Sequence, residues 1–400
     1  MRGRAGDWRA HVVLVALSTG LTLALVEGAA RVLLRPEPAE PLDGTPISQL
    51  SSTLGWTTLP SGWQRIRRPD FEVTVSINSR GLRGPDLPYQ AAPGRRRLAI
   101  MGDSFAHGYY AEEPETLRGR LAVALRACQV DVLNAGSPGY STDQEWLYFD
   151  EEIQKYDSRE VVLLFYYNDL LFNVEGIGTA NREKPFFLEK EGSLELVPPS
   201  FRTPVGPAIE DSPTPARNAP VFRHSALWAF LAARLQRSRP DWSRALSGHG
   251  LVPEFSATPP AEYLPFGPAD AGERSRVEQM WRVTTLILRR FRDDVRGRGA
   301  GISVFYVPAR FEVNDEAWTF LQRRYEADRP WKREAVSGRL ASELKSLDIP
   351  LIDAMTGFQA AEGSARKAYL AIDGHWNGRG NEIAFESLLP MMRRAFSCAS

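Results

Sequence analysis

From residue 97 onward, short apolar segments alternate with longer amphipathic ones, and no other feature of the sequence constrains the fold as much. The segment EVVLLFYYND at 160–169 stays apolar until its end, which is typical of a strand buried on both sides. The segment at 114–127 instead carries Leu117, Leu121 and Leu125 at helical spacing. This alternation predicts a parallel sheet with helices on both faces. We expect strands at 97–102, 130–136, 160–169, 301–310 and 350–355, and helices at 114–127, 142–156, 275–299, 331–347 and 380–396.

The regular alternation is lost at 175–270, a stretch rich in Pro and Gly. We expect an insertion into the α/β domain there. Within it, the segment at 186–198 predicts a hairpin, and the segment at 225–236 predicts a helix.

The region 35–96 is predicted to contain a linker and a small N-terminal cap. Residues 36–64 are rich in Pro, Gly, Ser and Thr, which indicates a linker and surface loop. The segment at 71–88 then alternates apolar and polar residues before it breaks at Gly81 and Gly84, which predicts a strand and a turn.

The N-terminal segment at 11–34 carries no Asp, Glu, Lys or Arg between Val12 and Val26, and it is long enough to span a membrane. Three arginines precede it: Arg2, Arg4 and Arg9. By the positive-inside rule, residues 1–10 are predicted to lie in the cytoplasm and the rest of the chain outside it. The small residues at 28–30 also resemble a signal-peptidase site, so a cleaved signal sequence is an alternative to an anchor, and a buried helix is a third.

Composition excludes several classes of function. Lys and Arg together number 49, as do Asp and Glu, and no dense basic run is present, so we expect no nucleic-acid partner. The two cysteines are too few for a disulfide-dense scaffold or a Cys-rich zinc site. No metal or cofactor is implied.

Polar residues gather where the predicted strands end. They are Gly102-Asp103-Ser104 after the first strand, NAGSPGYST (134–142) at the second, and Asn168-Asp169 at the third. A fourth block, AIDGHWNGRGN (371–381), precedes the last helix. Ligands of open parallel sheets bind beyond the carboxyl ends of the strands, so these blocks could together supply a nucleophile, a base and an oxyanion hole.

These four blocks resemble, in order and position, those of the SGNH (GDSL-type) hydrolases over about residues 97–396. The resemblance implies a three-layer α/β/α, flavodoxin-like domain with a five-stranded parallel sheet. It implies Ser104 as nucleophile, His375 as base and Asp373 as the residue that orients it. It also implies an oxyanion hole made by Gly139, Asn168 and the Ser104 N–H.

Two departures from the family pattern are present. Tyr166 stands where the family commonly has Gly, which suggests a more crowded pocket. The last block has Asp-x-His, whereas the family usually has Asp-x-x-His. The Asp-x-His spacing resembles that of the alginate-type acetyltransferases, so an acetyltransferase is an alternative to a hydrolase. The nucleophile elbow of α/β-hydrolases is a competing interpretation, but Ala106 replaces its second glycine.

Several further residues carry two interpretations each. Four aromatic residues near the expected nucleophile and base either line a substrate pocket or pack the loops: His107, Tyr109, Tyr110 and Trp376. Arg310 either binds an anionic group or forms a surface salt bridge. If the sheet is flavodoxin-like, the first and last helices lie side by side, so Cys128 and Cys398 could form a disulfide, with two free thiols as the alternative.

The sequence therefore predicts a membrane-tethered serine esterase with its catalytic domain outside the cytoplasm, in the periplasm or at the cell surface, or secreted if the first segment is cleaved. Its expected substrate is an acyl ester on a cell-surface polysaccharide or a small molecule. The alternatives are a polysaccharide O-acetyltransferase that uses the same triad, and an inactive glycan-binding or assembly scaffold.

Overall fold

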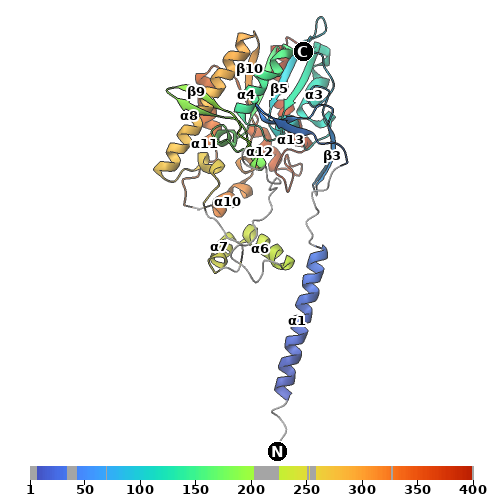
Figure 1. Ribbon diagram of the computed structural model, residues 1–400, viewed down its shortest axis with the longest axis vertical. Helices are drawn as coiled ribbons and strands as arrows, with labels where there is room; N and C mark the ends of the chain where they lie inside the picture. The colour runs from blue at the N-terminus through green and yellow to red at the C-terminus, as the bar shows by residue number, and fades with distance from the viewer. Residues whose placement is uncertain are drawn as a thin grey trace, which may run out of the picture. The chain divides into compact units, whose positions relative to one another are not determined.

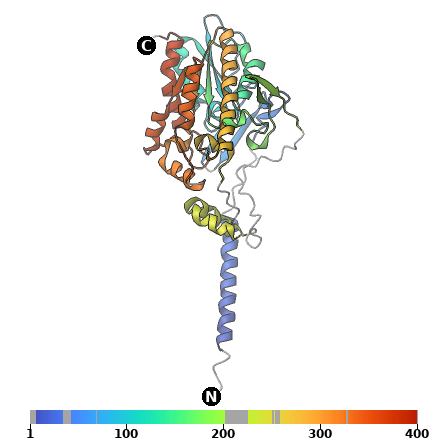
Figure 2. The ribbon, with the colours of Figure 1, turned by 90° about the vertical axis from the view of Figure 1, so that its left-hand side faces the viewer.

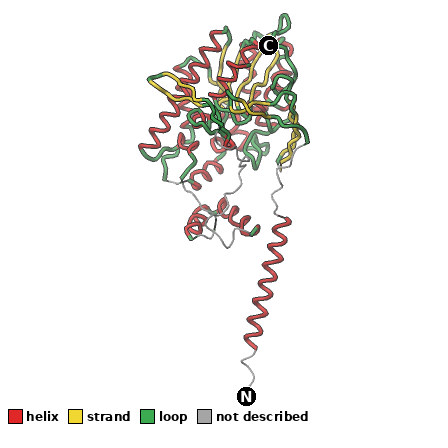
Figure 3. Tube along the Cα trace, viewed as in Figure 1, coloured by secondary structure: helices red, strands yellow, loops and turns green. Residues whose placement is uncertain are grey.

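The computed structural model describes residues 7–33, 43–68, 70–201, 225–249, 252, 258–325 and 328–398 (Figures 1 and 3). The chain divides into two compact units. The smaller comprises residues 1–39, 211–258 and 323–325, and the larger comprises residues 40–210, 259–322 and 326–400.

The larger unit is built on a parallel sheet of five strands in the order β11-β10-β7-β5-β6. In chain order this is 2-1-3-4-5 read from β6, the flavodoxin-like arrangement, so the predicted fold class is confirmed. The predicted strand positions are also confirmed, although three strands, β7, β10 and β11, are shorter than expected. The bounds are β5 (Arg96–Gly102), β6 (Val130–Gly136), β7 (Glu160–Phe165), β10 (Gly301–Tyr306) and β11 (Leu351–Asp353).

Helices cover both faces of this sheet (Figures 1 and 2). On one face α3 and α13 pack side by side and α12 contacts α13. On the other face α4 packs against α8, and Arg339 of α11 contacts Trp281 and Glu278 of α8. The bounds are α3 (Leu117–Ala124), α4 (Thr142–Glu151), α8 (Ala271–Gly297), α11 (Ala335–Ser346), α12 (Met355–Glu362) and α13 (Gly378–Ala395).

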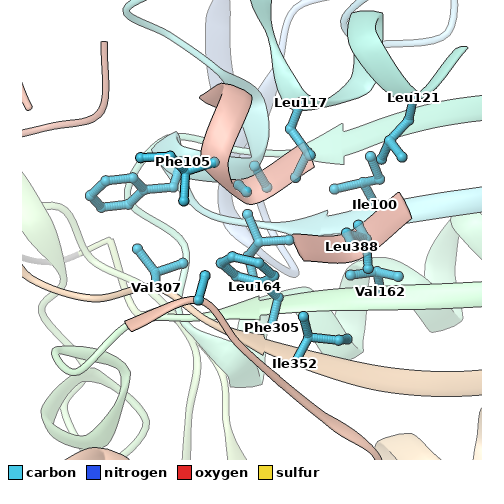
Figure 4. Close-up of a cluster of buried hydrophobic side chains, with 14 of the residues drawn as sticks. Ile100, Phe105, Leu117, Leu121, Val162, Leu164, Phe305, Val307, Ile352 and Leu388 are labelled. Carbon is cyan, nitrogen blue, oxygen red and sulfur yellow. The ribbon is translucent and has the colours of Figure 1, made fainter. Parts of the chain in front are cut away.

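The core between the sheet and the α3–α13 face is apolar (Figure 4). Leu117 and Leu121, two of the residues whose spacing predicts α3, are fully buried there against Ile100. Burying one such side chain stabilises the fold by about 1.5–3 kcal/mol. The helical spacing in the sequence thus marks the face that packs on the sheet.

The N-terminal cap contains two antiparallel hairpins, so the prediction of a linker and loop at 36–64 is wrong for part of that segment. The hairpins pair β1 (Ser48–Ser51) with β2 (Gly55–Thr58) and β3 (Trp63–Arg68) with β4 (Phe71–Ser76). The first three strands are short and rich in polar residues, so they lack the alternation that predicts β4. Tertiary contacts stabilise them instead, because Val73 and Val75 of β4 bury against Ile47 and Ile66.

The remaining elements of the larger unit are short. The hairpin predicted at 186–198 is confirmed as β8 (Phe186–Lys190) and β9 (Ser193–Val197). The strand expected at 301–310 ends at Tyr306, because Pro308 cannot donate to a strand ladder. The short helices are α2 (Ser104–His107), α5 (Asp169–Phe172), α9 (Arg310–Val313), α10 (Asp315–Arg324) and the 3-10 turns Glu113–Glu115, Arg126–Cys128, Ile153–Tyr156, Thr179–Asn181 and Ala261–Phe266.

The smaller unit contains three described helices: α1 (Asp7–Leu33), α6 (Ala226–Ser238) and α7 (Pro240–Gly248). Within α1, Ala10–Leu33 is long and apolar enough to cross a membrane, with a mean hydropathy of 1.9. The helix predicted at 225–236 is confirmed as α6. The sequence analysis missed α7, although Pro240 at its first position is a helix-start signal.

Cys128 and Cys398 are joined by a disulfide in the structure, with their Cα atoms 5.3 Å apart. Cys128 ends the 3-10 turn that follows α3, and Cys398 follows α13. Because α3 and α13 pack side by side, their carboxyl ends bring the two cysteines together.

Candidate active site

Ser104 stands at a tight corner where β5 ends and α2 begins. Gly102 has a φ of +147°, and a Cβ there would lie 2.8 Å from the Ala106 Cβ and 2.9 Å from the Leu164 Cβ, so only glycine fits. Asp103 Oδ1 accepts a 2.8 Å hydrogen bond from the Phe105 N–H and so caps α2. The corner holds Ser104 at the carboxyl edge of the sheet.

Ser104, His375 and Asp373 form one hydrogen-bonded chain. Ser104 Oγ lies 2.8 Å from His375 Nε2, and His375 Nδ1 is bonded to Asp373 Oδ1. The side chains of His375 and Asp373 remain 26% and 31% exposed, so a substrate can reach them. The Asp-x-His spacing therefore brings the carboxylate to the imidazole within one loop.

The surroundings of the Asp373 carboxylate favour its ionised form. Burial acts to raise the pKa of Asp373, but hydrogen bonds from His375 and Tyr110 and attraction to His375 outweigh it, so this pKa lies below its ordinary value. An ionised carboxylate holds a proton on Nδ1 and leaves Nε2 free to accept the Ser104 proton.

Two aromatic rings enclose the His375 imidazole. Phe105 stacks on it with ring centroids 4.7 Å apart, and Tyr110 stacks on it at 4.1 Å, with interplanar angles of 29° and 26°. These contacts fix the plane of the imidazole. Neither was foreseen as a stacking partner, although Tyr110 was a candidate pocket residue.

The N-terminal cap contributes directly to this arrangement through Asp70. Its Oδ2 accepts hydrogen bonds from the backbone N–H groups of Ile372 (3.0 Å) and Asp373 (3.2 Å). Arg310, which was considered for anion binding, donates to the Ala371 carbonyl at 3.0 Å. Both residues hold the loop that carries Asp373 and His375. No sequence signal linked Asp70 to a loop some three hundred residues away.

We expect Asp70→Ala to lower kcat about tenfold to a hundredfold, because a displacement of about 1 Å in a catalytic group has an effect of that size. Hydrolysis of p-nitrophenyl acetate measures it. Asp86→Ala is the matched control, since Asp86 also accepts hydrogen bonds within the N-terminal region, from Ser79 N–H and Oγ, but contacts no site residue that the structure describes. Equal activities of the two variants would contradict the role of Asp70.

Gly139 and Asn168 lie in the loops beyond the two strands that flank β5. The Ser137 N–H donates to the Gly102 carbonyl at 2.9 Å, which joins the loop of Gly139 to the Ser104 corner. Gly139 has a φ of +81°, and a Cβ there would lie 2.2 Å from Thr179 Oγ1. Asn168 is half-buried at the start of α5. Their role in an oxyanion hole stays a prediction.

The four aromatic candidates separate into two pairs. His107 and Trp376 are 0% and 2% exposed, and Trp376 stacks on Phe358 in the core, which favours the packing interpretation for both. Tyr109 and Tyr110 remain partly exposed near His375. Tyr166, the departure from the family glycine, packs its ring 4.9 Å from that of Phe105.

A cavity of about 360 Å³ adjoins these groups. Tyr109 lines it, and so do Ser137 and Pro138, which directly precede Gly139. The cap supplies the opposite wall, where the Trp56 Nε1–H donates to the Pro138 carbonyl at 3.0 Å. The Arg182 guanidinium also lines the cavity and lies 5.4 Å from the centroid of Trp56.

Behind the site lies a buried ionic group that the sequence analysis missed. Lys184 Nζ pairs with Asp143 Oδ2, and both side chains are 0% exposed. Lys184 also donates to the carbonyls of Phe172 (2.7 Å) and Pro185 (2.8 Å). Asp143 belongs to α4, which follows the Gly139 loop, so the pair ties that loop to the segment before β8.

Burial raises the pKa of Asp103 to about 6, despite the opposing hydrogen bond from the Phe105 N–H. The folded protein therefore binds a proton more readily than the unfolded chain between about pH 4 and 6, and this carboxyl makes the fold less stable as the pH rises through that window.

The variant Asp103→Asn keeps an oxygen for the Phe105 N–H but cannot ionise. We expect its free energy of unfolding, relative to that of the wild type, to increase by about 2 kcal/mol between pH 4 and pH 7, as measured by urea denaturation. The free energy of unfolding of Asp86→Asn, relative to that of the wild type, should instead decrease as the pH rises, because the hydrogen bonds from Ser79 lower the pKa of Asp86. If Asp103→Asn and the wild type differed in free energy of unfolding by the same amount at pH 4 and pH 7, this prediction would be contradicted.

Residues 270–399 match the family model described as ALGX, SGNH hydrolase-like domain, acetyltransferase AlgX. This match confirms the resemblance to SGNH hydrolases. The matched segment contains Asp373 and His375, and Ser104 lies outside it. No curated protein sequence matches the chain significantly.

Three of the solved structures similar to this chain are TesA, Axe2 and LAE5. TesA is 10% identical, with 75% of this chain and 99% of that chain covered and a TM-score of 0.37. A catalytic mutant of Axe2, an acetylxylan esterase from Geobacillus stearothermophilus, is 11% identical, with coverages of 76% and 96% and a TM-score of 0.36. LAE5, an alpha/beta hydrolase enzyme from the metagenome of Lake Arreo, is 12% identical, with coverages of 78% and 99% and a TM-score of 0.38.

Proposed function

We propose that the protein is a membrane-anchored serine esterase that cleaves acyl esters outside the cytoplasm through an acyl-enzyme on Ser104. The observation that carries this proposal is the hydrogen-bonded chain from Ser104 Oγ to His375 Nε2, at 2.8 Å, and on to Asp373. A serine hydroxyl needs an adjacent base to become a nucleophile, and the base needs a fixed tautomer.

In the first half-reaction, Ser104 Oγ attacks the acyl carbonyl carbon while His375 Nε2 takes the hydroxyl proton. The tetrahedral oxyanion accepts hydrogen bonds from the N–H groups of Ser104 and Gly139 and from the Asn168 amide, each worth about 3 kcal/mol. Collapse of the intermediate breaks the ester C–O bond, and His375 returns the proton to the leaving alkoxide. In the second half-reaction, His375 takes a proton from water as the water attacks the acyl carbon, and it returns this proton to Ser104 Oγ as the Ser104 Oγ–acyl bond breaks and the carboxylic acid leaves.

The cavity beside the site supports a glycan as the carrier of the ester. It is lined by the partly exposed phenol of Tyr109, whose face suits the apolar face of a sugar ring, together with polar groups from Gln64 and Arg182. Tyr109 packs on Tyr110 and Tyr110 stacks on His375, so the rings of two tyrosines connect this cavity to the catalytic base.

A second candidate function, a polysaccharide O-acetyltransferase, differs only in the acyl acceptor. It is favoured by the match of residues 270–399 to a model whose description names an acetyltransferase, and by the Asp-x-His spacing inside that match. A sugar hydroxyl would then replace water in the second half-reaction and give its proton to His375.

One assay tests both candidates. The purified full chain is supplied with p-nitrophenyl acetate, with and without an oligosaccharide acceptor, and nitrophenol, free acetate and acetylated sugar are measured. An esterase releases acetate equal to nitrophenol under both conditions. A transferase forms acetylated sugar and releases nitrophenol faster when the acceptor is present. Nitrophenol release no faster than that of Ser104→Ala would overturn both.

The membrane part of the proposal rests on α1. Its segment Ala10–Leu33 can span a bilayer, and Arg2, Arg4 and Arg9 precede it, so the amino terminus faces the cytoplasm and the larger unit lies on the opposite side.

A further inference from the structure

We propose that α6 and α7 form a helix pair that lies on the outer surface of the membrane and docks on α1 through Glu27. It follows that α1 is a retained anchor and not a cleaved signal sequence. This inference rests on the membrane anchoring proposed above, and it concerns only the smaller unit, to which all three helices belong. Figure 2 shows α6, in yellow, beside the carboxyl end of α1, in blue, and the two helices are in contact.

Glu27 of α1 caps the amino terminus of α6. Its carboxylate accepts hydrogen bonds from Ser225 Oγ (2.7 Å), the Ala226 N–H (2.8 Å) and the Leu227 N–H (3.2 Å). The first N–H groups of a helix have no partner within that helix, and the helix dipole favours a negative charge at this end. Glu27 therefore supplies acceptors for the first N–H groups of α6, a role that a capping residue next to the helix in sequence usually has.

This contact distinguishes an anchor from a signal sequence. Cleavage near the small residues at 28–30 would remove Glu27 and leave the N–H groups of Ala226 and Leu227 without their carboxylate. Ala30, which would lie next to the cut, is only 5% exposed in the smaller unit. The chain thus uses its apolar segment as a structural partner for residues two hundred positions later.

The position of Glu27 along α1 sets the depth of the helix pair. Residues 10–26 include no Asp, Glu, Lys or Arg. They rise about 25 Å at about 1.5 Å per residue, which is close to the hydrocarbon thickness of about 30 Å. Glu27 therefore lies near the outer boundary of the hydrocarbon, and α6 begins at that level.

The side chains of the pair suit this location. Phe230 and Leu231 of α6 are 42% and 43% exposed, and Trp242 of α7 is 67% exposed. Exposed Trp, Phe and Leu on short helices are typical of segments that lie in a membrane interface. Arg239, at the junction of the two helices, is also exposed and can meet lipid phosphates.

Site-specific fluorescence in vesicles of phosphatidylcholine and phosphatidylglycerol tests the location. The two native cysteines are bonded to each other, so a single introduced cysteine can be labelled with a polarity-sensitive dye. Nitroxide-bearing lipid should quench the fluorescence of a dye attached to Trp242→Cys in the full chain about twofold or more, because residue 242 lies in the membrane interface. Val123→Cys, which is 68% exposed on α3 of the larger unit, is the matched control and should not be quenched.

Mass spectrometry of the same preparation separates the possible failures. A chain that begins after residue 27 would overturn both the anchoring and this inference. A full-length chain with equal quenching at 242 and 123 would overturn the helix pair alone. Protection of 242 from a water-soluble quencher without quenching by lipid would also overturn it, since that result indicates a protein partner.

The contact with Glu27 has its own test by hydrogen exchange in nanodiscs. Glu27→Ala should speed exchange at the Ala226 and Leu227 amides about tenfold, because both lose their acceptor. Arg31→Ala is the control, since it removes the ion pair of Glu27 with Arg31 but none of the hydrogen bonds that Glu27 accepts from α6. Exchange that is the same in both variants would overturn the docking through Glu27.

Discussion

Ser104→Ala is expected to abolish covalent labelling by a fluorophosphonate probe and to lower kcat for p-nitrophenyl acetate about 10³-fold or more. The probe reacts with a serine oxygen only when a base removes its proton, and Ser104 Oγ lies 2.8 Å from His375 Nε2. Gel fluorescence measures the labelling, and nitrophenol release measures kcat.

Ser303→Ala is the matched control for this prediction. Ser303 is 1% exposed on β10 of the same sheet, and its hydroxyl has no hydrogen-bond partner among the residues that the structure describes. Its replacement should leave both labelling and kcat unchanged. Labelling that survives in folded Ser104→Ala would assign the nucleophile to another residue.

Lys184→Met is expected to lower the free energy of unfolding by about 3–5 kcal/mol, because it leaves the buried carboxylate of Asp143 without its partner. The Lys184 Nζ also donates to the backbone carbonyls of Phe172 and Pro185, and both would lose that hydrogen bond. Urea denaturation followed by circular dichroism measures the change.

The control is Lys190→Met, since Lys190 pairs with Glu195 on the surface, where the two side chains are 62% and 51% exposed. Exposed pairs of this kind contribute only about 0–1 kcal/mol. The double variant Lys184→Met, Asp143→Leu should recover part of the lost stability, because it removes both charges. If Lys184→Met were no less stable than Lys190→Met, the buried pair would have no structural role.

Local patterns in the sequence were sufficient to predict much of the fold. The apolar run at 160–169 and the spacing of Leu117 and Leu121 record how each segment is buried, and burial is what forms β7 and α3. Local patterns failed for β1, β2 and β3, whose short polar strands depend on partners elsewhere in the cap.

The residues of the candidate site also divide into those that local patterns in the sequence indicate and those that they do not. The residues proposed as nucleophile, base and orienting acid stand in short blocks at the ends of predicted elements, so the sequence could indicate them. Asp70 and Lys184 stand in no such block, and Phe105, which directly follows Ser104, gave no sign that its ring stacks on His375. Their contacts with the Asp373 loop, the His375 ring and Asp143 join segments that the chain keeps far apart.

By itself, the sequence determined which segments form the sheet, the residues proposed for the reaction, and one apolar segment able to span a membrane, because each depends on neighbouring residues. Only the tertiary structure decided that the cap holds the Asp373 loop, that two rings enclose His375, and that Glu27 caps α6. Each of these depends on distances between residues remote in the chain, which packing sets and local sequence does not encode.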